Sequence, residues 1–168
     1  LAAAGEGRAP EVDALVLAAP AIAGGAALGP ASRGAAWLLA ALAPDRRWTG
    51  EGLVRFQASD DVAMLRGLAA DPLYLGAPSA REILGLIRVM DRAAAAAPGA
   101  AQPTLVLHGA RDALVRPEDV RAVSETLPNR TAFRLYREGW HLLFRDLQKR
   151  RVWEDVLAFI RMVAAARG

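Results

Sequence analysis

The sequence of 168 residues has no cysteine, two histidines and a single lysine, Lys149. Without cysteine there is no disulfide bond, thiolate nucleophile or cysteine-ligated metal, although the cell compartment stays undefined. The two histidines lie far apart and lack the spacing of zinc ligands, so we expect no metal centre. No apolar run approaches the ~20 residues that a membrane-spanning helix needs, and no charged segment precedes an apolar one as it does in a signal peptide.

Features of nucleic-acid and nucleotide binding are also lacking. The net charge is only +3, and the arginines are scattered or alternate with acidic residues instead of forming a basic face. Gly24-Gly25 is not followed by the lysine of a phosphate-binding loop, and Gly109 leads into an acidic residue. We therefore expect no cofactor and no nucleic-acid partner. A cytoplasmic location is the expectation for this chain, although the sequence does not fix it.

What is present is the pattern of one α/β domain, because 168 residues suffice for a single core. Short apolar runs bounded by turn residues predict strands at 13–19, 104–107 and 131–136. The first run does not alternate, which suits a strand buried on both faces of a parallel sheet. A Ser79–Glu82 capping box begins a helix that ends at Pro98-Gly99, and further helices are expected from Pro117 and across Val152–Val163. This order predicts parallel strands with right-handed crossovers.

Residues 21–78 have a different pattern, in which glycine and proline separate short helices and no strand is predicted. One helix is expected over 31–42, and a second is expected to be capped by Ser59 and to stop at Asp71-Pro72. An all-helical insertion between two strands indicates a cap over the edge of a sheet. We therefore divide the chain into a core, residues 1–20 and 79–168, and a helical lid, residues 21–78.

Two polar residues follow two neighbouring predicted strands. Asp112 comes three positions after the glycine of His108-Gly109, and His141 ends the turn Gly139-Trp140-His141 after the next strand. Because parallel strands end at the same edge of a sheet, Asp112 can accept from one ring nitrogen of His141 and leave the other as a base. Each residue alone has a plainer interpretation, a turn aspartate or a packed histidine. Their joint position favours a functional pair that serves a nucleophile.

Apolar neighbours of this pair are the candidates for substrate contact or for packing behind His141. They are Ala113, Leu114, Val115, Trp140 and Leu142. His108, at the end of its strand, is instead expected to bond to the backbone and shape the turn. Most apolar residues of the lid are expected to pack the lid on the sheet. A wholly apolar lid nonetheless fits an acyl or aryl ester better than a charged metabolite.

Residues 103–112, Leu114–Pro117, Leu135-Tyr136 and 139–147 together resemble the C-terminal half of α/β-hydrolases. The most similar subgroup is that of the monoacylglycerol lipases and lysophospholipases, with the related serine aminopeptidases. The resemblance implies parallel strands with flanking helices and a lid, and it is specific over about residues 101–160. It also implies that Asp112 orients and stabilises the imidazolium of His141, which would act as general base and then as acid.

This sequence departs from the family pattern at the nucleophile. The family carries its serine in Gly-x-Ser-x-Gly, and none of the four serines, Ser32, Ser59, Ser79 and Ser124, lies in such a motif. In this family strand 13–19 would pair with the nucleophile strand, so we expect an N-terminal segment of the same protein beside it. We expect a serine hydrolase of acylglycerol- or lysophospholipid-like esters, with possible lipid-surface contact through the lid. The alternative is an inactive or truncated binding protein of the same fold.

Overall fold

A parallel sheet of three strands forms the centre of the molecule. The computed structural model describes residues 1–9, 11–22, 29–47, 57–74, 76–128 and 131–166. Its strands, in the spatial order β1-β2-β3, are β1 (Leu15–Ala18), β2 (Thr104–Gly109) and β3 (Thr131–Tyr136). Both neighbouring pairs are parallel, with Leu107 opposite Ala18 on one side and opposite Arg134 on the other. The predicted strands and their parallel order are confirmed.

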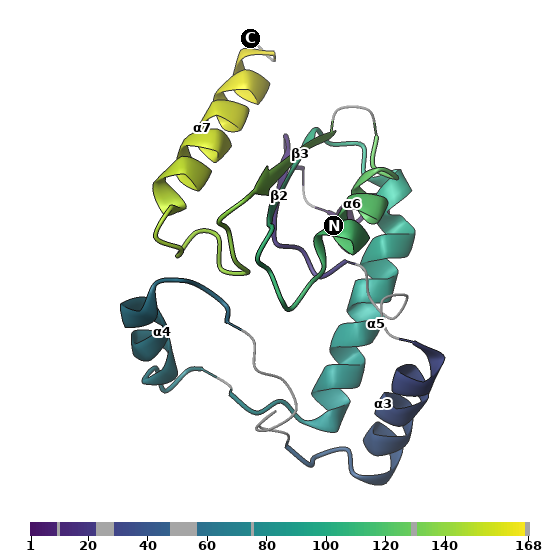
Figure 1. Ribbon diagram of the computed structural model, residues 1–168. Helices are drawn as coiled ribbons and strands as arrows, with labels where there is room; N and C mark the ends of the chain where they lie inside the picture. The colour runs from purple at the N-terminus through teal and green to yellow at the C-terminus, as the bar shows by residue number, and fades with distance from the viewer. Residues whose placement is uncertain (10, 23–28, 48–56, 75, 129–130, 167–168) are drawn as a thin grey trace.

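Helices cover both faces of the sheet. Figure 1 shows α7 (Lys149–Ala165) on one side, and α5 (Ala80–Ala96) and α6 (Pro117–Ser124) on the other. The short α1 (Ala2–Gly5) packs against α5 near the C-terminal end of that helix, which continues into the 3-10 turn η1 (Ala97–Gly99). None of the described helices is long and apolar enough to cross a membrane.

The central strand supplies both halves of the core. All six residues of β2 are buried. Val106 packs with the cluster that includes α5 and α6, whereas Leu105 and Leu107 pack with Val152 and Phe159 of α7. This alternation follows from the pleat of a strand, which sends successive side chains to opposite faces. The strand therefore fixes the position of its C-terminal end with apolar packing on both faces.

The edge strand β1 differs from the expectation of a strand buried on both faces. Its residues are only partly buried, and Val16 is 36% exposed. The physical reason is that β1 has a hydrogen-bonded neighbour on one side only within the part of the chain that the structure describes. Full burial is a property of β2, which has neighbours on both sides.

Two helices lie in the described part of residues 21–78, namely α3 (Pro30–Leu42) and α4 (Val62–Ala69). They lie apart in Figure 1, with α3 beside α5 and α4 beyond the start of α7. Arg33 of α3 donates to Asp91 of α5 at 3.0 Å. The division into core and lid stays a prediction: α3 packs against α5, whereas residues 58–60, before α4, bond to Leu142 and Leu147.

Helix capping confirms one predicted residue and corrects another. Ser79 accepts from the N–H of Glu82, and the Glu82 carboxylate accepts from the N–H of Ser79, so the predicted capping box is present. Ser59 does not cap α4; Asp61 does, because it directly precedes the helix and accepts from the N–H of Met64 at 2.9 Å. Ser59 lies two residues earlier and is fully buried.

Candidate active site

Asp112 lies in the loop that follows β2, and its carboxylate is fully engaged by donors. Oδ1 accepts from the backbone N–H groups of Leu114 at 2.9 Å and Val115 at 3.0 Å. Oδ2 accepts from Nδ1 of His141 at 2.8 Å. Burial by itself would raise the pKa of Asp112, but hydrogen bonds from His141 and from those two N–H groups outweigh it and lower the pKa. Asp112 is therefore an ionised acceptor with a fixed orientation.

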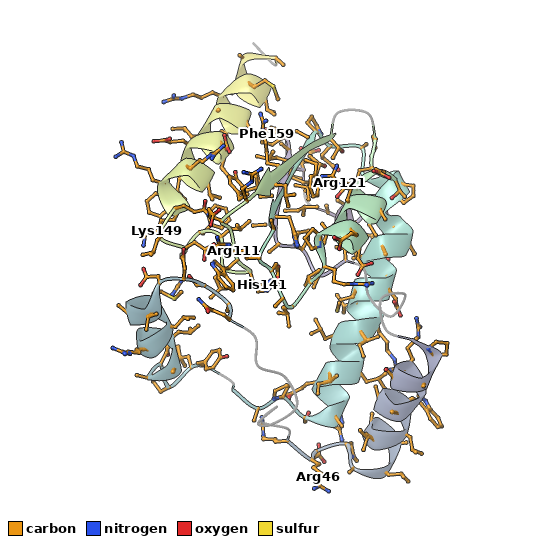
Figure 2. The ribbon with its side chains drawn as sticks, in the orientation of Figure 1. Arg46, Arg111, Arg121, His141, Lys149 and Phe159 are labelled. Carbon is orange, nitrogen blue, oxygen red and sulfur yellow. The ribbon has the colours of Figure 1, made fainter. Side chains whose placement is uncertain are left out.

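His141 lies in the loop that follows β3, and Figure 2 shows it near Arg111 at the end of the sheet that faces α4. Because the Asp112 carboxylate can only accept, Nδ1 of His141 carries the proton of the 2.8 Å bond. Nε2 is then unprotonated and able to take a proton from another group. The ring is 23% exposed while Asp112 is buried, so the base is reachable and its partner is not.

Two glycines bring the loops of Asp112 and His141 together. A Cβ on Gly109 would lie 2.4 Å from the carbonyl oxygen of Gly139 and 2.5 Å from that of Trp140. A Cβ on Gly139 would lie 3.0 Å from the Cα of Gly109. In addition, the N–H of Arg111 donates to the carbonyl of Gly139 at 2.9 Å. Backbone contact, possible only without side chains, thus sets the separation of acid and base.

His108 has the structural role that the sequence predicts. It is fully buried, and its Nε2–H donates to the carbonyl of Val115 at 3.0 Å. Burial lowers the pKa of His108, although the Val115 carbonyl and the charge of Asp112 oppose that effect. The ring is therefore a neutral donor that holds the loop on which Asp112 sits, and not a second base.

The five predicted substrate-contact residues lie in different surroundings. Ala113 is exposed and Leu114 is 50% exposed beside the acid, while Trp140 and Leu142 are partly buried beside His141. Val115 is buried within the hydrophobic core next to α6, and its N–H binds Asp112. Contact of any of them with a substrate stays a prediction.

Two buried residues lie beside the turn of His141, and sequence reasoning did not associate them with it. Asp146 is fully buried, and its Oδ2 accepts from the N–H of Trp140 at 2.8 Å. Ser59, buried before α4, lies close to Asp146, and its hydroxyl lowers the pKa of that carboxyl group. The only sequence signal for Asp146 was that it is an acidic residue in an otherwise apolar and basic stretch. Contact of Ser59 with Asp146 joins parts of the chain that no local pattern relates.

The four serines have other structural roles. Ser79 caps α5, Ser124 donates to the carbonyl of Val120 at 2.7 Å within α6, and Ser32 lies near the start of α3. None of the hydrogen bonds of His141 found in the described part of the chain involves a serine. Within that same part, no three His, Asp or Glu side chains are grouped as metal ligands would be.

Three parallel strands between helices, with an acid and a histidine at the ends of neighbouring strands, define the class as a partial α/β-hydrolase fold. The family model described as serine aminopeptidase, S33, matches residues 1–148. The chain belongs to this family of α/β-hydrolases. A search of curated protein sequences finds no match.

Solved structures of lipolytic enzymes share this fold. The monoacylglycerol lipase of Paleococcus ferrophilus has a TM-score of 0.79 and 20% identity, over 95% of this chain and 62% of its own. A soluble variant of the monoglyceride lipase of Saccharomyces cerevisiae, in complex with a substrate analogue, has a TM-score of 0.76 and 19% identity, over 96% of this chain and 57% of its own. A structure of the metagenome-derived lipolytic enzymes LipS and LipT has a TM-score of 0.70 and 19% identity, over 96% and 59%. The chain thus spans about three fifths of the length of these structures.

Proposed function

We propose that the chain supplies the acid and the histidine of a serine hydrolase that cleaves carboxylic esters. The single observation that carries this proposal is the bond between Asp112 and Nδ1 of His141, at 2.8 Å, while the described residues make no bond to the opposite ring nitrogen. A buried, ionised carboxylate on one ring nitrogen fixes the tautomer that a general base requires. A protein that only binds a ligand has no need of this arrangement.

In the proposed reaction, Nε2 of His141 takes the proton of a serine hydroxyl while the serine oxygen attacks the ester carbonyl carbon. Asp112 stabilises the imidazolium that forms. The alcohol leaves with the proton from Nε2, and an acyl-enzyme remains. His141 then takes a proton from water, whose oxygen attacks the acyl carbon, and returns that proton to the serine as the carboxylic acid leaves. The serine belongs to a part of the whole protein outside this chain.

We assign the position beside β1 to that part of the protein. Two features of the described chain support this assignment. The free edge of β1 is an apolar strand, which proteins rarely leave unpaired. On α7, Trp153, Leu157 and Ile160 recur at helical spacing, and each is about half exposed. A stripe of this kind is normally covered by another element.

The proposed substrate is an ester with an apolar acyl group, such as a monoacylglycerol or a lysophospholipid. Apolar residues follow both members of the pair, with Leu114 two positions after Asp112 and Leu142 directly after His141. An apolar pocket of about 430 Å³ beside α4 includes Leu65, Leu68 and Tyr74. Similarity to monoacylglycerol and monoglyceride lipases agrees with this choice. On α3, Trp37 is 60% and Leu42 is 75% exposed, which supports lipid contact through this helix.

The proposal is tested by labelling the full-length protein with a fluorophosphonate, which reacts with activated serines. Labelling is expected in the wild type and is expected to disappear in His141→Ala, with the melting temperature as a control for folding. A folded wild-type protein that neither reacts nor hydrolyses a p-nitrophenyl ester would contradict the proposal. Such a result would favour a non-catalytic binding protein of the same fold.

A further inference from the structure

A second buried carboxylate lies five residues after His141 and takes no part in the proposed proton transfers. Asp146 is fully buried, and its Oδ1 has no hydrogen-bond partner in the part of the chain that the structure describes. Burial raises the pKa of Asp146, while hydrogen bonds from the Trp140 N–H and from Ser59 lower it. A carboxylate in such a place carries a desolvation cost that simple packing would avoid.

The contacts of Asp146 close the chain around the histidine. We define the histidine turn as residues 140–147. The Trp140 N–H, directly before His141, donates to Oδ2 of Asp146 at 2.8 Å. The N–H of Asp146 donates in turn to the carbonyl of Leu142 at 3.1 Å. Leu143, between them, is 1% exposed and packs in the core beside α7. Trp140 and Asp146, the first and the penultimate residue of the turn, are therefore joined by a hydrogen bond across His141.

The same turn is joined to the chain that precedes α4. The N–H of Leu142 donates to the carbonyl of Ala58 at 2.8 Å, and the N–H of Leu147 donates to Asp60 at 2.8 Å. Ser59, between these two residues, is fully buried and lies close to Asp146, whose pKa its hydroxyl lowers. Residues 58–60 thus lie along the histidine turn, and the buried carboxyl group of Asp146 lies at their junction.

Resting on the proposed function, we propose that Asp146 is a positioning residue for His141. It holds the histidine turn closed and joins it to residues 58–60, so that the imidazole stays in line with Asp112. Among the described residues, the His141 ring is held by its bond to Asp112, and rotation or displacement of the His141 backbone would weaken that bond. Displacement of a catalytic group by about 1 Å costs on the order of a hundredfold in rate.

The test uses the full-length protein with two substitutions at this position and one control. Asp146→Ala removes the acceptor of the Trp140 N–H. Asp146→Asn keeps a carbonyl oxygen that accepts from the Trp140 N–H and places its amide group where Oδ1 has no partner. The control is Asp155→Asn, which alters a partly buried carboxylate of α7 that accepts from the Tyr136 hydroxyl at 2.7 Å and does not contact the histidine turn.

Kinetics on a p-nitrophenyl ester and the low-field NMR signal of the His141 Nδ1 proton are measured for each protein. We expect Asp146→Ala to lower kcat by about tenfold to a hundredfold with KM within about threefold, and to broaden or abolish the low-field signal. Asp146→Asn is expected to keep most of kcat and the signal, as is Asp155→Asn. A purely structural role would lower the melting temperature without changing the signal or kcat of the folded protein.

The inference is overturned if Asp146→Ala keeps the wild-type kcat and low-field signal, or if Asp146→Asn fails as badly as Asp146→Ala. If Asp146→Ala does not fold, Ser59→Ala is the deciding variant, because it removes only one neighbour of Asp146. An unchanged kcat and an unchanged low-field signal in Ser59→Ala would overturn the inference. Failure of the proposed function gives a different result from failure of this inference. If the proposed function is wrong, His141→Ala hydrolyses the ester as the wild type does. In that case loss of the signal in Asp146→Ala would still support the positioning role.

Discussion

At the scale of single residues, two neighbouring side chains differ in charge: His108 lies near the end of β2, and Asp112 lies in the loop that follows it. Asp112 is buried and charged, and three donors stabilise its charge. His108 is buried and neutral, since burial lowers its pKa. The two lie 3.7 Å apart, between Nε2 of His108 and Oδ2 of Asp112. At this distance His108 does not form a hydrogen bond to Oδ2 of Asp112, so it does not compete with His141 for that oxygen. It supports the loop instead.

We predict that Asp112→Asn lowers kcat by about a thousand- to ten-thousandfold. The Asn oxygen would stay where Oδ1 accepts from Leu114 and Val115, so the amide group would face Nδ1 of His141. Nδ1 would then have to accept, and Nε2 would carry the proton and could not act as a base. The measurement is ester hydrolysis by the full-length protein. Asp119→Asn, at an exposed ion pair with Arg116, is the control and should remain active.

We predict that His108 makes the protein less stable as the pH falls. The pKa of buried His108 lies below 6.5, so the unfolded state takes up a proton before the folded state does. The free energy of unfolding must then fall with decreasing pH below about 6.5, by at most about 1.4 kcal/mol per pH unit for this group. His108→Gln, which keeps a donor, should flatten this dependence in urea titrations between about pH 7 and pH 5. Parallel curves for wild type and variant would contradict the prediction.

Residues of the site differ in how far sequence could reveal them. Asp112 and His141 were predictable because each directly follows a strand, and strand ends share an edge. Asp146 was not, because its importance depends on burial and on Ser59, 87 positions earlier in the sequence. Ser59 was instead assigned to helix capping from its residue type. The side-chain oxygen nearest to the start of α4 belongs to Asp61.

At the scale of elements, the site depends on how closely the loops after β2 and β3 approach. Gly109 ends β2, and Gly139 lies three residues beyond the end of β3. Their backbones touch where any other residue would place a Cβ. The parallel pairing of β2 with β3 fixes the register up to Gly109 and Tyr136, so the loops cannot slide to relieve a clash.

We predict that Gly109→Ala reduces activity by about a hundredfold and destabilises the protein by about 1–3 kcal/mol. The new Cβ would lie 2.4 Å from the carbonyl oxygen of Gly139, and both loops would have to separate. Gly85→Ala is the matched control, since nothing lies within 4 Å of its Cβ on the exposed side of α5. That change should leave activity intact and stabilise the helix by up to about 1 kcal/mol. Kinetics and urea denaturation measure both effects, and equal behaviour of the two variants would contradict the prediction.

Local signals were sufficient for most helices and strands of the core. Helix α5 is determined locally by the capping box at Ser79. Helix α7 is determined locally by the spacing of Val152, Val156 and Val163. The burial of β1 could not be predicted in the same way, because it depends on which element lies at its other edge. The path of α3 against α5 and that of residues 58–60 against the histidine turn likewise depend on distant contacts, such as that of Arg33 with Asp91.

At the scale of the whole molecule, β1 and α7 each present an apolar surface. Val16 on β1 and Trp153 on α7 are both more than a third exposed. Burial of apolar surface contributes about 25 cal/mol per Å², so an uncovered strand edge and helix stripe together leave much stabilisation unused. The related solved structures, of which this chain covers 57% to 62%, each have further length outside the matched part.

We predict that a further strand pairs with β1 in the full-length protein, and hydrogen exchange can test this within one molecule. The N–H groups of Leu15 and Ala19 donate to Pro103 and Leu107 of the β2 side. By the alternation of a strand, the N–H of Leu17 also faces β2, while those of Val16 and Ala18 face the other edge. If a strand pairs there, the amides of Val16 and Ala18 must exchange as slowly as that of Leu17. Fast exchange at Val16 and Ala18, with protection kept at Leu17, would mean that the edge is open and that the serine has to come from another position.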